Sequence, residues 1–234
     1  MKEIKFSINQ DILKIVALVT MTIDHIAKYL LDGVSAEIGI CIGRISFPIF
    51  ALLLMKHLAE KHIYKKYIIR LSFFGVLAFG VVMFWSGFSD NCKIFPLNIL
   101  FSFLNVVLFL RVIEWIKNEE GSLFIKKIFV GIVFLFFGVF SLFLDYDVFG
   151  FLLMVLLYHY FIKKKVWIFW VILLLSGLIN ISMPYWFVSL LTMAILLLND
   201  FDKEHKRIIK HWWLFYVYYV LHLFVIFGIS YFLQ

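Results

Sequence analysis

Apolar runs approaching twenty residues follow one another along nearly the whole chain, and they constrain its fold more than any other feature. They fall at about 12–31, 37–59, 67–86, 97–116, 125–143, 147–162, 166–181, 183–199 and 211–232. A helix of about 20 apolar residues crosses the roughly 30 Å hydrocarbon core of a bilayer. The sequence therefore predicts an all-α integral membrane protein, a polytopic bundle of about nine transmembrane helices that forms a single domain over residues 1–234.

The composition excludes a water-facing globular fold. Hydrophobic residues make up 64% of the chain, aromatic residues make up 20%, and the mean hydropathy is +1.00. A soluble protein of this size cannot expose that much apolar surface without aggregating. Lipid is thus the expected solvent, and the short polar connections leave no room for a second, soluble domain.

The net charge of +7 is placed in alternate loops, which predicts an orientation. Lys2 and Lys5 precede the first run, and Asp32 and Glu37 follow it. Every second later loop is rich in lysine, at 56–70, 126–127, 163–165 and 203–210. The positive-inside rule then predicts a cytoplasmic N-terminus and an outer C-terminus. This explains the basic excess without a nucleic-acid partner, and the abundant Ile, Phe and Lys favour a multi-pass protein of a bacterial cytoplasmic membrane.

Cysteine usage indicates neither a metal site nor a disulfide. Cys41 falls inside a predicted helix, Cys92 falls in a loop, and the two have no C-x-x-C spacing.

Ionisable side chains inside the apolar runs mark the candidate functional site. Each costs at least a few kcal/mol in the bilayer, so such groups usually face the interior of the bundle. The first run carries Lys14, Asp24, His25 and Lys28, and the eleven residues from Lys14 to His25 cover about 16 Å along one helix face. These residues predict one polar stripe leading from the cytoplasm into the bundle.

Further polar residues are expected at the outer half of the membrane. Arg44 in the second run falls at a depth similar to that of His25, and His222 lies near the middle of the last run. Asn98, Asp145 and Tyr146 stand at the predicted outer mouth. We expect His25, Asp24, Arg44 and His222 to line one cavity with them.

Structural interpretations compete with this functional one. Lys14 and Lys28 near helix ends are also suited to snorkelling towards the interface, and Asp24 with Lys28 forms an i,i+4 pair that neutralises itself. Pro48 is compatible with a simple kink beside Arg44. Lys56 and Arg70 are equally consistent with solvated charge on the cytoplasmic side.

Four segments resemble, in order, the signature segments of the TraX family. They are LKIVALVTMTIDHI, IGRISFPIFALLL, LDYDVFGFLL and FYVYYVLHLFVIF, and together they span nearly the whole chain. The family is named for acetylation of conjugative pilin and is similar to the wider transmembrane acyltransferases that use acyl-CoA. In that wider group an arginine normally precedes the first-helix histidine by eleven positions, where this chain has Lys14. The family's Asp-Tyr-Gly reads Asp145, Tyr146, Asp147 here.

The resemblance and the polar stripe together predict acyl transfer. The donor is a cytoplasmic acyl-CoA, most simply acetyl-CoA, and the acceptor is an amine or hydroxyl reached from the outer side or within the membrane. His25 is expected to act as general base or as a transient acyl carrier, with His222 in the same catalytic group. Arg44 is suited to stabilise an oxyanion or to hold the pantetheine arm, and Asp24 is suited to pair with Lys28 or Arg44. Lys14, Lys56 and Arg70 are candidates for the coenzyme phosphates.

Two other functions remain open at this point. Buried His, Asp, Lys and Arg also make proton relays, so an ion-coupled transporter or proton-conducting protein is the alternative. A structural subunit with paired charges is the third possibility. The sequence leaves the acceptor open between a protein N-terminus, a glycan and another polymer.

Overall fold

Ten helices make up the part of the chain that the computed structural model describes, residues 9–86, 98–180, 184–199 and 211–233. They are α1 (Gln10–Leu30), α2 (Gly33–Gly43), α3 (Ser46–Lys61), α4 (Tyr64–Ser86), α5 (Ile99–Asn118), α6 (Leu123–Ser141), α7 (Asp147–Lys163), α8 (Val166–Leu178), α9 (Tyr185–Leu198) and α10 (Leu214–Leu233). Lys2, Lys5, Cys92 and the lysines of 203–210 lie outside the described residues.

The predicted polytopic membrane helix bundle is confirmed. Five helical stretches are long and apolar enough to cross a membrane, namely Gly33–Lys61, Tyr64–Trp85, Ile99–Asn118, Leu123–Ser141 and Leu214–Leu233. The helices α7, α8 and α9 are shorter, at 17, 13 and 14 residues, and α1 carries four charged side chains. The number of crossings and the cytoplasmic N-terminus stay predictions.

The second predicted run, 37–59, is divided into two helices at Arg44 and Ile45. Pro48 explains the position of the break, because a proline ring clashes with the carbonyl four residues earlier, which here belongs to Arg44. The backbone N–H groups of Arg44 and Ile45 donate instead to Cys41 and Ile42, three residues back, at 3.2 Å. Pro48, in the first turn of α3, therefore accounts for the break, and Arg44 stands at the joint between the two helices.

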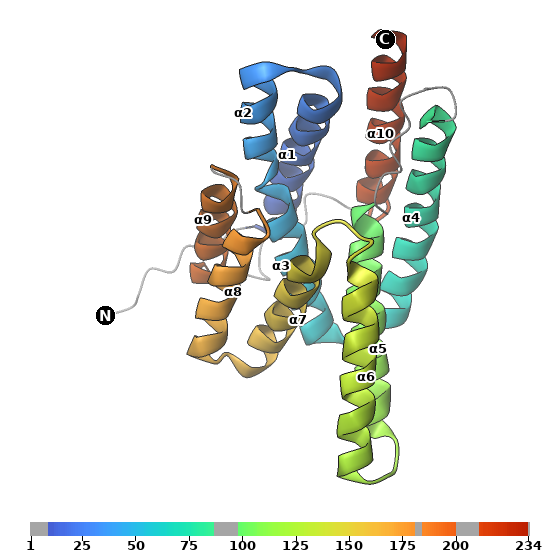
Figure 1. Ribbon diagram of the computed structural model, residues 1–234, viewed down its shortest axis with the longest axis vertical. Helices are drawn as coiled ribbons and strands as arrows, with labels where there is room; N and C mark the ends of the chain where they lie inside the picture. The colour runs from blue at the N-terminus through green and yellow to red at the C-terminus, as the bar shows by residue number, and fades with distance from the viewer. Residues whose placement is uncertain (1–8, 87–97, 181–183, 200–210, 234) are drawn as a thin grey trace.

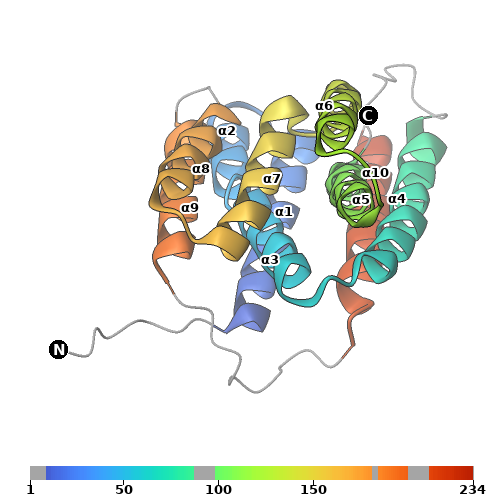
Figure 2. The same cartoon turned by 90° about the horizontal axis from the view of Figure 1, so that it is seen from below.

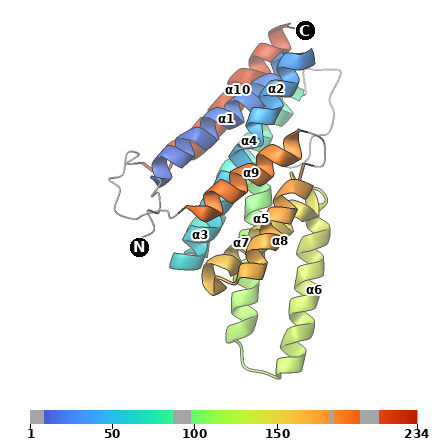
Figure 3. The ribbon, with the colours of Figure 1, turned by 90° about the vertical axis from the view of Figure 1, so that its left-hand side faces the viewer.

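Successive connections lie at alternating ends of the helices they join. The turns α1–α2, α6–α7 and α8–α9 are at the upper ends in Figure 1, and the turns α3–α4, α5–α6 and α7–α8 are at the lower ends. Helix α1 packs against α2, α3 and α10, while α3 packs against α7 and α9 (Figure 2). Figures 1 and 3 both show the α5–α6 hairpin projecting beyond the neighbouring helices. The first and last helices are thus neighbours at the centre of the fold.

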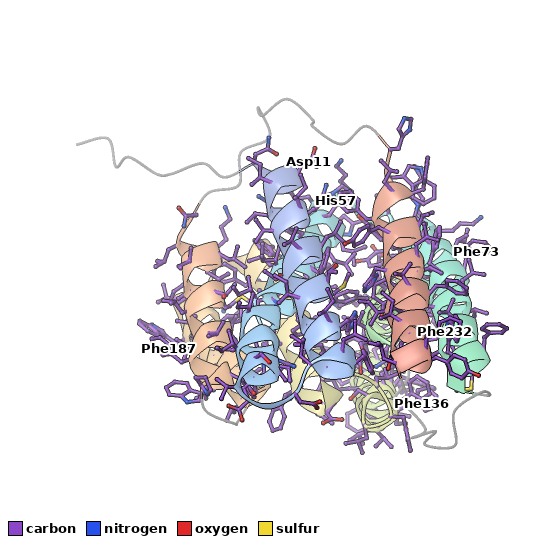
Figure 4. All side chains as sticks on the ribbon, turned by 90° about the horizontal axis from the view of Figure 1, so that it is seen from above. Asp11, His57, Phe73, Phe136, Phe187 and Phe232 are labelled. Carbon is purple, nitrogen blue, oxygen red and sulfur yellow. The ribbon has the colours of Figure 1, made fainter. Side chains whose placement is uncertain are left out.

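Large aromatic side chains cover the outside of the bundle. Phe73, Phe136 and Phe187 are 59%, 64% and 52% exposed and point away from the helices in Figure 4. The core combines aliphatic and sulfur-containing residues such as Leu52 and Met55, which are fully buried, with aromatic rings such as that of Phe151. A bilayer-facing surface of this kind needs no partner protein to explain it.

Two glycines allow α2 to approach α1 closely. A Cβ atom added at Gly43 would lie 2.2 Å from the Asp24 Cβ, and one added at Gly39 would lie 2.5 Å from the Ala27 Cβ. Neither contact is possible for real atoms, so a larger residue would push the helices apart. Gly43 thereby permits the residue that follows it, Arg44, to meet Asp24.

Alanine at position 43 is expected to destabilise the protein by about 2–3 kcal/mol, because the added methyl group overpacks the α1–α2 contact. The same change at Gly131 on α6, where nothing lies within 4 Å, should instead stabilise by about 0.5–1 kcal/mol through helix propensity. Unfolding of both variants in detergent micelles measures the difference. Equal effects at the two sites would show that the close approach is not required.

The α6–α7 turn contains two consecutive residues in the left-handed region. Tyr146 has φ 67° and Asp147 has φ 47°. Glycine adopts such angles without a steric cost, whereas aspartate tolerates them less well. The glycine of the family's Asp-Tyr-Gly pattern therefore suits the backbone that Asp147 adopts here.

Asp147→Gly is expected to be about 1 kcal/mol more stable than Asp147→Ala, since both remove the carboxylate and only alanine keeps the strained Cβ. The midpoint of thermal unfolding of the two variants checks this. Alanine matching glycine would mean that the left-handed angle carries no cost at this position.

Candidate functional site

His25 of α1 and His222 of α10 form the centre of the candidate site. The His25 Nδ1 lies 2.7 Å from the His222 Nε2, and the rings stack with centroids 5.0 Å apart at an angle of 12°. His222 is buried and His25 is half-buried. The two residues are 197 positions apart in sequence, and the packing of α1 against α10 brings them together.

The direction of hydrogen bonding along this pair follows from its last acceptor. The His222 Nδ1 lies 3.0 Å from the carbonyl oxygen of Tyr218, which can only accept. For a neutral His222, the proton is then on Nδ1, and Nε2 must accept from the His25 Nδ1–H. The His25 Nε2 is left with a free lone pair, and it has no hydrogen-bond partner among the described residues. This is the protonation pattern that a general base requires.

Contacts above and below the histidines hold α1 and α10 in register. Thr22 Oγ1 and Tyr218 Oη share a hydrogen bond of 2.8 Å, and the Tyr29 and Phe227 rings lie 4.5 Å apart. Because the residue numbers rise together on both helices, the two helices run parallel. The contact between His25 and His222 is therefore one of a series of side-chain contacts along α1 and α10.

Asp24, one position before His25, faces a different neighbour. Its Oδ2 accepts from Lys28 Nζ, and its Oδ1 accepts from Arg44 Nη2 at 3.1 Å. Asp24 is 7% exposed, and the Arg44 side chain is 13% exposed. Successive residues of a helix point about 100° apart. Asp24 therefore binds the cations at the α2–α3 joint and does not orient His25.

Arg44 is held from its other side by α8 and α9. Its Nη1 donates to Asn180 Oδ1 at 3.1 Å, and Asn180 Nδ2 in turn donates to Ser189 Oγ at 2.7 Å. The Tyr185 ring centroid lies 5.8 Å from the Arg44 Cζ. The Arg44 Nε is buried and has no hydrogen-bond partner among the described residues. Its N–H is thus a buried donor of a permanently charged group that the described part of the fold does not satisfy.

Asp145 and Tyr146 of the α6–α7 turn approach the same charges. Burial raises the pKa of the Asp145 carboxyl to about 7; Lys28 and Arg44 oppose this shift, and Asp24 and Asp147 add to it. The Tyr146 ring stacks on Phe47 of α3 at 3.9 Å. Asp145 thus lies near a cluster with excess positive charge, and burial disfavours the ionised form of its carboxyl.

Lys14 and Arg70, two of the candidate coenzyme ligands, both contact the beginning of α10. Lys14 Nζ binds Asp11 Oδ1 at 2.8 Å and lies 5.4 Å from the Phe215 ring centroid. Arg70 lies over Trp212 with 3.6 Å between Cζ and the ring centroid. Lys56, the third candidate, is half-buried on α3. The structure gathers Lys14 and Arg70 at one end of the bundle, the end opposite to that of the histidine pair along α1 and α10.

Asn98 links α5 to α4 through two hydrogen bonds. Its Oδ1 caps α5 by accepting from the Leu100 N–H at 3.1 Å, and its Nδ2 donates to the Gly75 carbonyl at 2.9 Å. These bonds tie α5 to α4, and none of them reaches the histidine pair or Arg44. The structure thus brings Asp145 and Tyr146, but not Asn98, to the charged cluster.

Sequence reasoning missed Asn180, Ser189 and Tyr185. A signal was present, because Asn180 ends an otherwise apolar run and Ser189 interrupts the next one. The sequence nevertheless could not pair them with a residue 136 positions away from Asn180.

Comparison with known proteins identifies one family. The family model described as TraX protein matches residues 9–230, which is nearly the whole chain. No curated protein and no solved structure matches. All four segments that carry the resemblance lie inside the matched range.

Proposed function

Because this chain belongs to the TraX family, we propose that it is a membrane-embedded acyltransferase. The acyl group, most simply acetyl, comes from a cytoplasmic acyl-CoA and passes to an amine or hydroxyl acceptor at the membrane or its outer face. The protein is proposed to work in a bacterial cytoplasmic membrane. Pilin is the acceptor that the family's name suggests, and a glycan or another polymer fits the same chemistry.

The observation that carries this proposal is the directed hydrogen-bond chain from His25 through His222 to the Tyr218 carbonyl. It leaves a basic nitrogen, the His25 Nε2, without a partner among the described residues. The acceptor's N–H or O–H loses its proton to this nitrogen while its N or O bonds to the thioester carbon. The C–S bond then breaks, and the protonated His25 returns the proton to the coenzyme thiolate.

Arg44 is assigned to the negative charge that develops on the thioester oxygen. Arg44 binds Asp24, the residue directly before His25 on α1, so the guanidinium and the imidazole lie at a similar level of the bundle. The buried Nε–H of Arg44 has no hydrogen-bond partner in the part of the chain that the structure describes. A fixed cationic donor in a dry site stabilises an oxyanion far better than water does. Asp24 holds this guanidinium in place.

The opposite end of α1 is assigned to the coenzyme. Lys14 and Arg70 flank the start of α10, and the eleven residues from Lys14 to His25 span about 16 Å. That distance suits an extended pantetheine arm reaching from bound phosphates to the reacting thioester. Lys14 pairs with Asp11 and Arg70 rests on Trp212, so coenzyme binding must replace or share these contacts. Lys56 completes this proposed set.

The proposal is tested with purified protein in liposomes and radiolabelled acetyl-CoA, with and without a crude envelope extract as acceptor. His25→Ala and protein-free liposomes are the controls. Label in an acceptor that depends on His25 supports direct transfer, and label on the protein itself supports a histidine acyl carrier. If folded wild-type protein neither binds nor turns over acetyl-CoA, the enzyme proposal fails. Proton flux into the same liposomes would then favour the transporter.

A further inference from the structure

The Arg44 guanidinium is attached to two separate parts of the fold. Its Nη2 binds Asp24 of α1, and its Nη1 binds Asn180, just after the end of α8. The Asn180 side chain is itself fixed by Ser189 of α9. Arg44 itself stands at the break between α2 and α3.

The hydrogen bonds from Arg44 to Asn180 and from Asn180 to Ser189 can run in one direction only. A guanidinium only donates, so the Asn180 oxygen must face Arg44 and its nitrogen must face Ser189. Ser189 Oγ is therefore the acceptor at 2.7 Å. Each terminal nitrogen of Arg44 makes one hydrogen bond, and Nε is the buried nitrogen of the guanidinium that makes none among the described residues. A buried donor without a partner is destabilising, and a bound oxygen would relieve that cost.

Asn180 is uncharged, and this property matters for the charge around Arg44 as much as its hydrogen bond does. Lys28, Arg44 and Asp24 together carry two positive charges and one negative charge. An aspartate at position 180 would also bind Arg44, but it would cancel the remaining positive charge. An amide holds the guanidinium while leaving that charge available to an anionic oxygen.

We propose that Asn180 and Ser189 are positioning residues for acyl transfer, which hold Arg44 so that its Nε–H meets the developing oxyanion. This inference rests on the proposed function. It assigns the α8–α9 pair a part in the reaction without direct contact with the substrate.

The experiment compares kcat and KM for acetyl-CoA in the wild type, Asn180→Ala, Asn180→Asp and Ser189→Ala. The matched control is Ser176→Ala, which removes a buried hydroxyl of α8 that bonds to the Leu173 carbonyl and makes no hydrogen bond to Arg44, Asn180 or Ser189. Asn180→Ala should lower kcat by about 10–100-fold with KM within twofold, because a misplaced oxyanion donor affects the transition state. Asn180→Asp should lower kcat at least as much, and Ser176→Ala should leave it unchanged.

A structural role alone predicts a different pattern. It would lower the amount of folded protein in Asn180→Ala and keep kcat per folded molecule within twofold of that of Ser176→Ala. That result overturns the inference. Full activity in Asn180→Asp would overturn the part assigned to the neutral amide.

A second measurement separates this inference from the proposed function. The chain has four arginines, so ¹⁵N-arginine labelling gives four Nε–H signals, and Arg44→Lys identifies that of Arg44. The signal should be ordered in the wild type and should broaden or exchange faster in Asn180→Ala, but not in Ser176→Ala. If the wild type does not turn over acetyl-CoA, the enzyme proposal fails while this signal still decides the positioning. If the Arg44 Nε–H signal is unchanged in Asn180→Ala, the positioning role of Asn180 is rejected, whether or not the wild type turns over acetyl-CoA.

Discussion

His25→Ala is expected to lower the rate of acyl transfer by about 10²–10⁴-fold, because it removes the nitrogen that accepts the acceptor's proton. The fold should persist, since α1 and α10 keep the Thr22–Tyr218 and Tyr29–Phe227 contacts. Labelled product formed per folded molecule measures the loss. A variant with wild-type transfer would remove His25 from the mechanism.

Two substitutions of His222 test whether it orients His25. His222→Leu leaves the His25 Nδ1–H without an acceptor, so His25 can adopt the wrong tautomer and transfer should fall by about 10²-fold. His222→Gln restores an acceptor oxygen and should recover part of the rate. Tyr218→Phe is the control, because it loses the hydroxyl bond to Thr22 and keeps the backbone carbonyl. Equal rates in the Leu and Gln variants would contradict the proposed tautomer.

Asp24→Ala is expected to cost about 3–5 kcal/mol of stability, the largest loss of any single substitution considered. Asp24 accepts from both Lys28 and Arg44, and Arg44 is too buried to reach water when its partner is removed. Lys28, at 35% exposure, can move towards the interface. Unfolding in mixed micelles with increasing SDS measures the loss.

The control for Asp24 is Arg111→Ala. Arg111 binds Glu114 at 3.1 Å, but its side chain is 53% exposed, and such pairs contribute about 1 kcal/mol or less. Adding Arg44→Ala to Asp24→Ala should cost less than Arg44→Ala costs in the wild type, because the two charges depend on each other. If Asp24→Ala lowers stability only slightly, and its effect adds to that of Arg44→Ala, the charged cluster is well solvated.

The sequence predicted the helices more successfully than the contacts between them. Hydropathy placed the ends of most helices within a few residues, because the length of an apolar run reports directly on the bilayer. It could not show that the run containing Pro48 is two helices, since a proline produces either a kink or a break. Its preferred pairing of Asp24 with Lys28 or Arg44 is confirmed, and both partners bind at once.

The site was predictable in its residues and not in its geometry. Buried ionisable groups stand out in an apolar sequence, which is why His25, Arg44 and His222 could be selected. Their contacts depend on which helices are neighbours, and hydropathy carries no information on that. Asn98 was assigned to the acceptor side from depth alone, whereas it caps α5 and bonds to α4. Asn180 was passed over, although it binds Arg44 directly.

The parallel contact between α1 and α10 has a consequence for biosynthesis. The ribosome delivers α1 to the membrane first, and His222, 197 positions after His25, is translated much later. During that interval the first helix carries Asp24, Lys28 and His25 in lipid without its final neighbour. The α2–α3 joint arrives early and neutralises the carboxylate through Arg44. The histidine pair is complete only when the last helix inserts, so under the proposed mechanism a partly made chain lacks the oriented base.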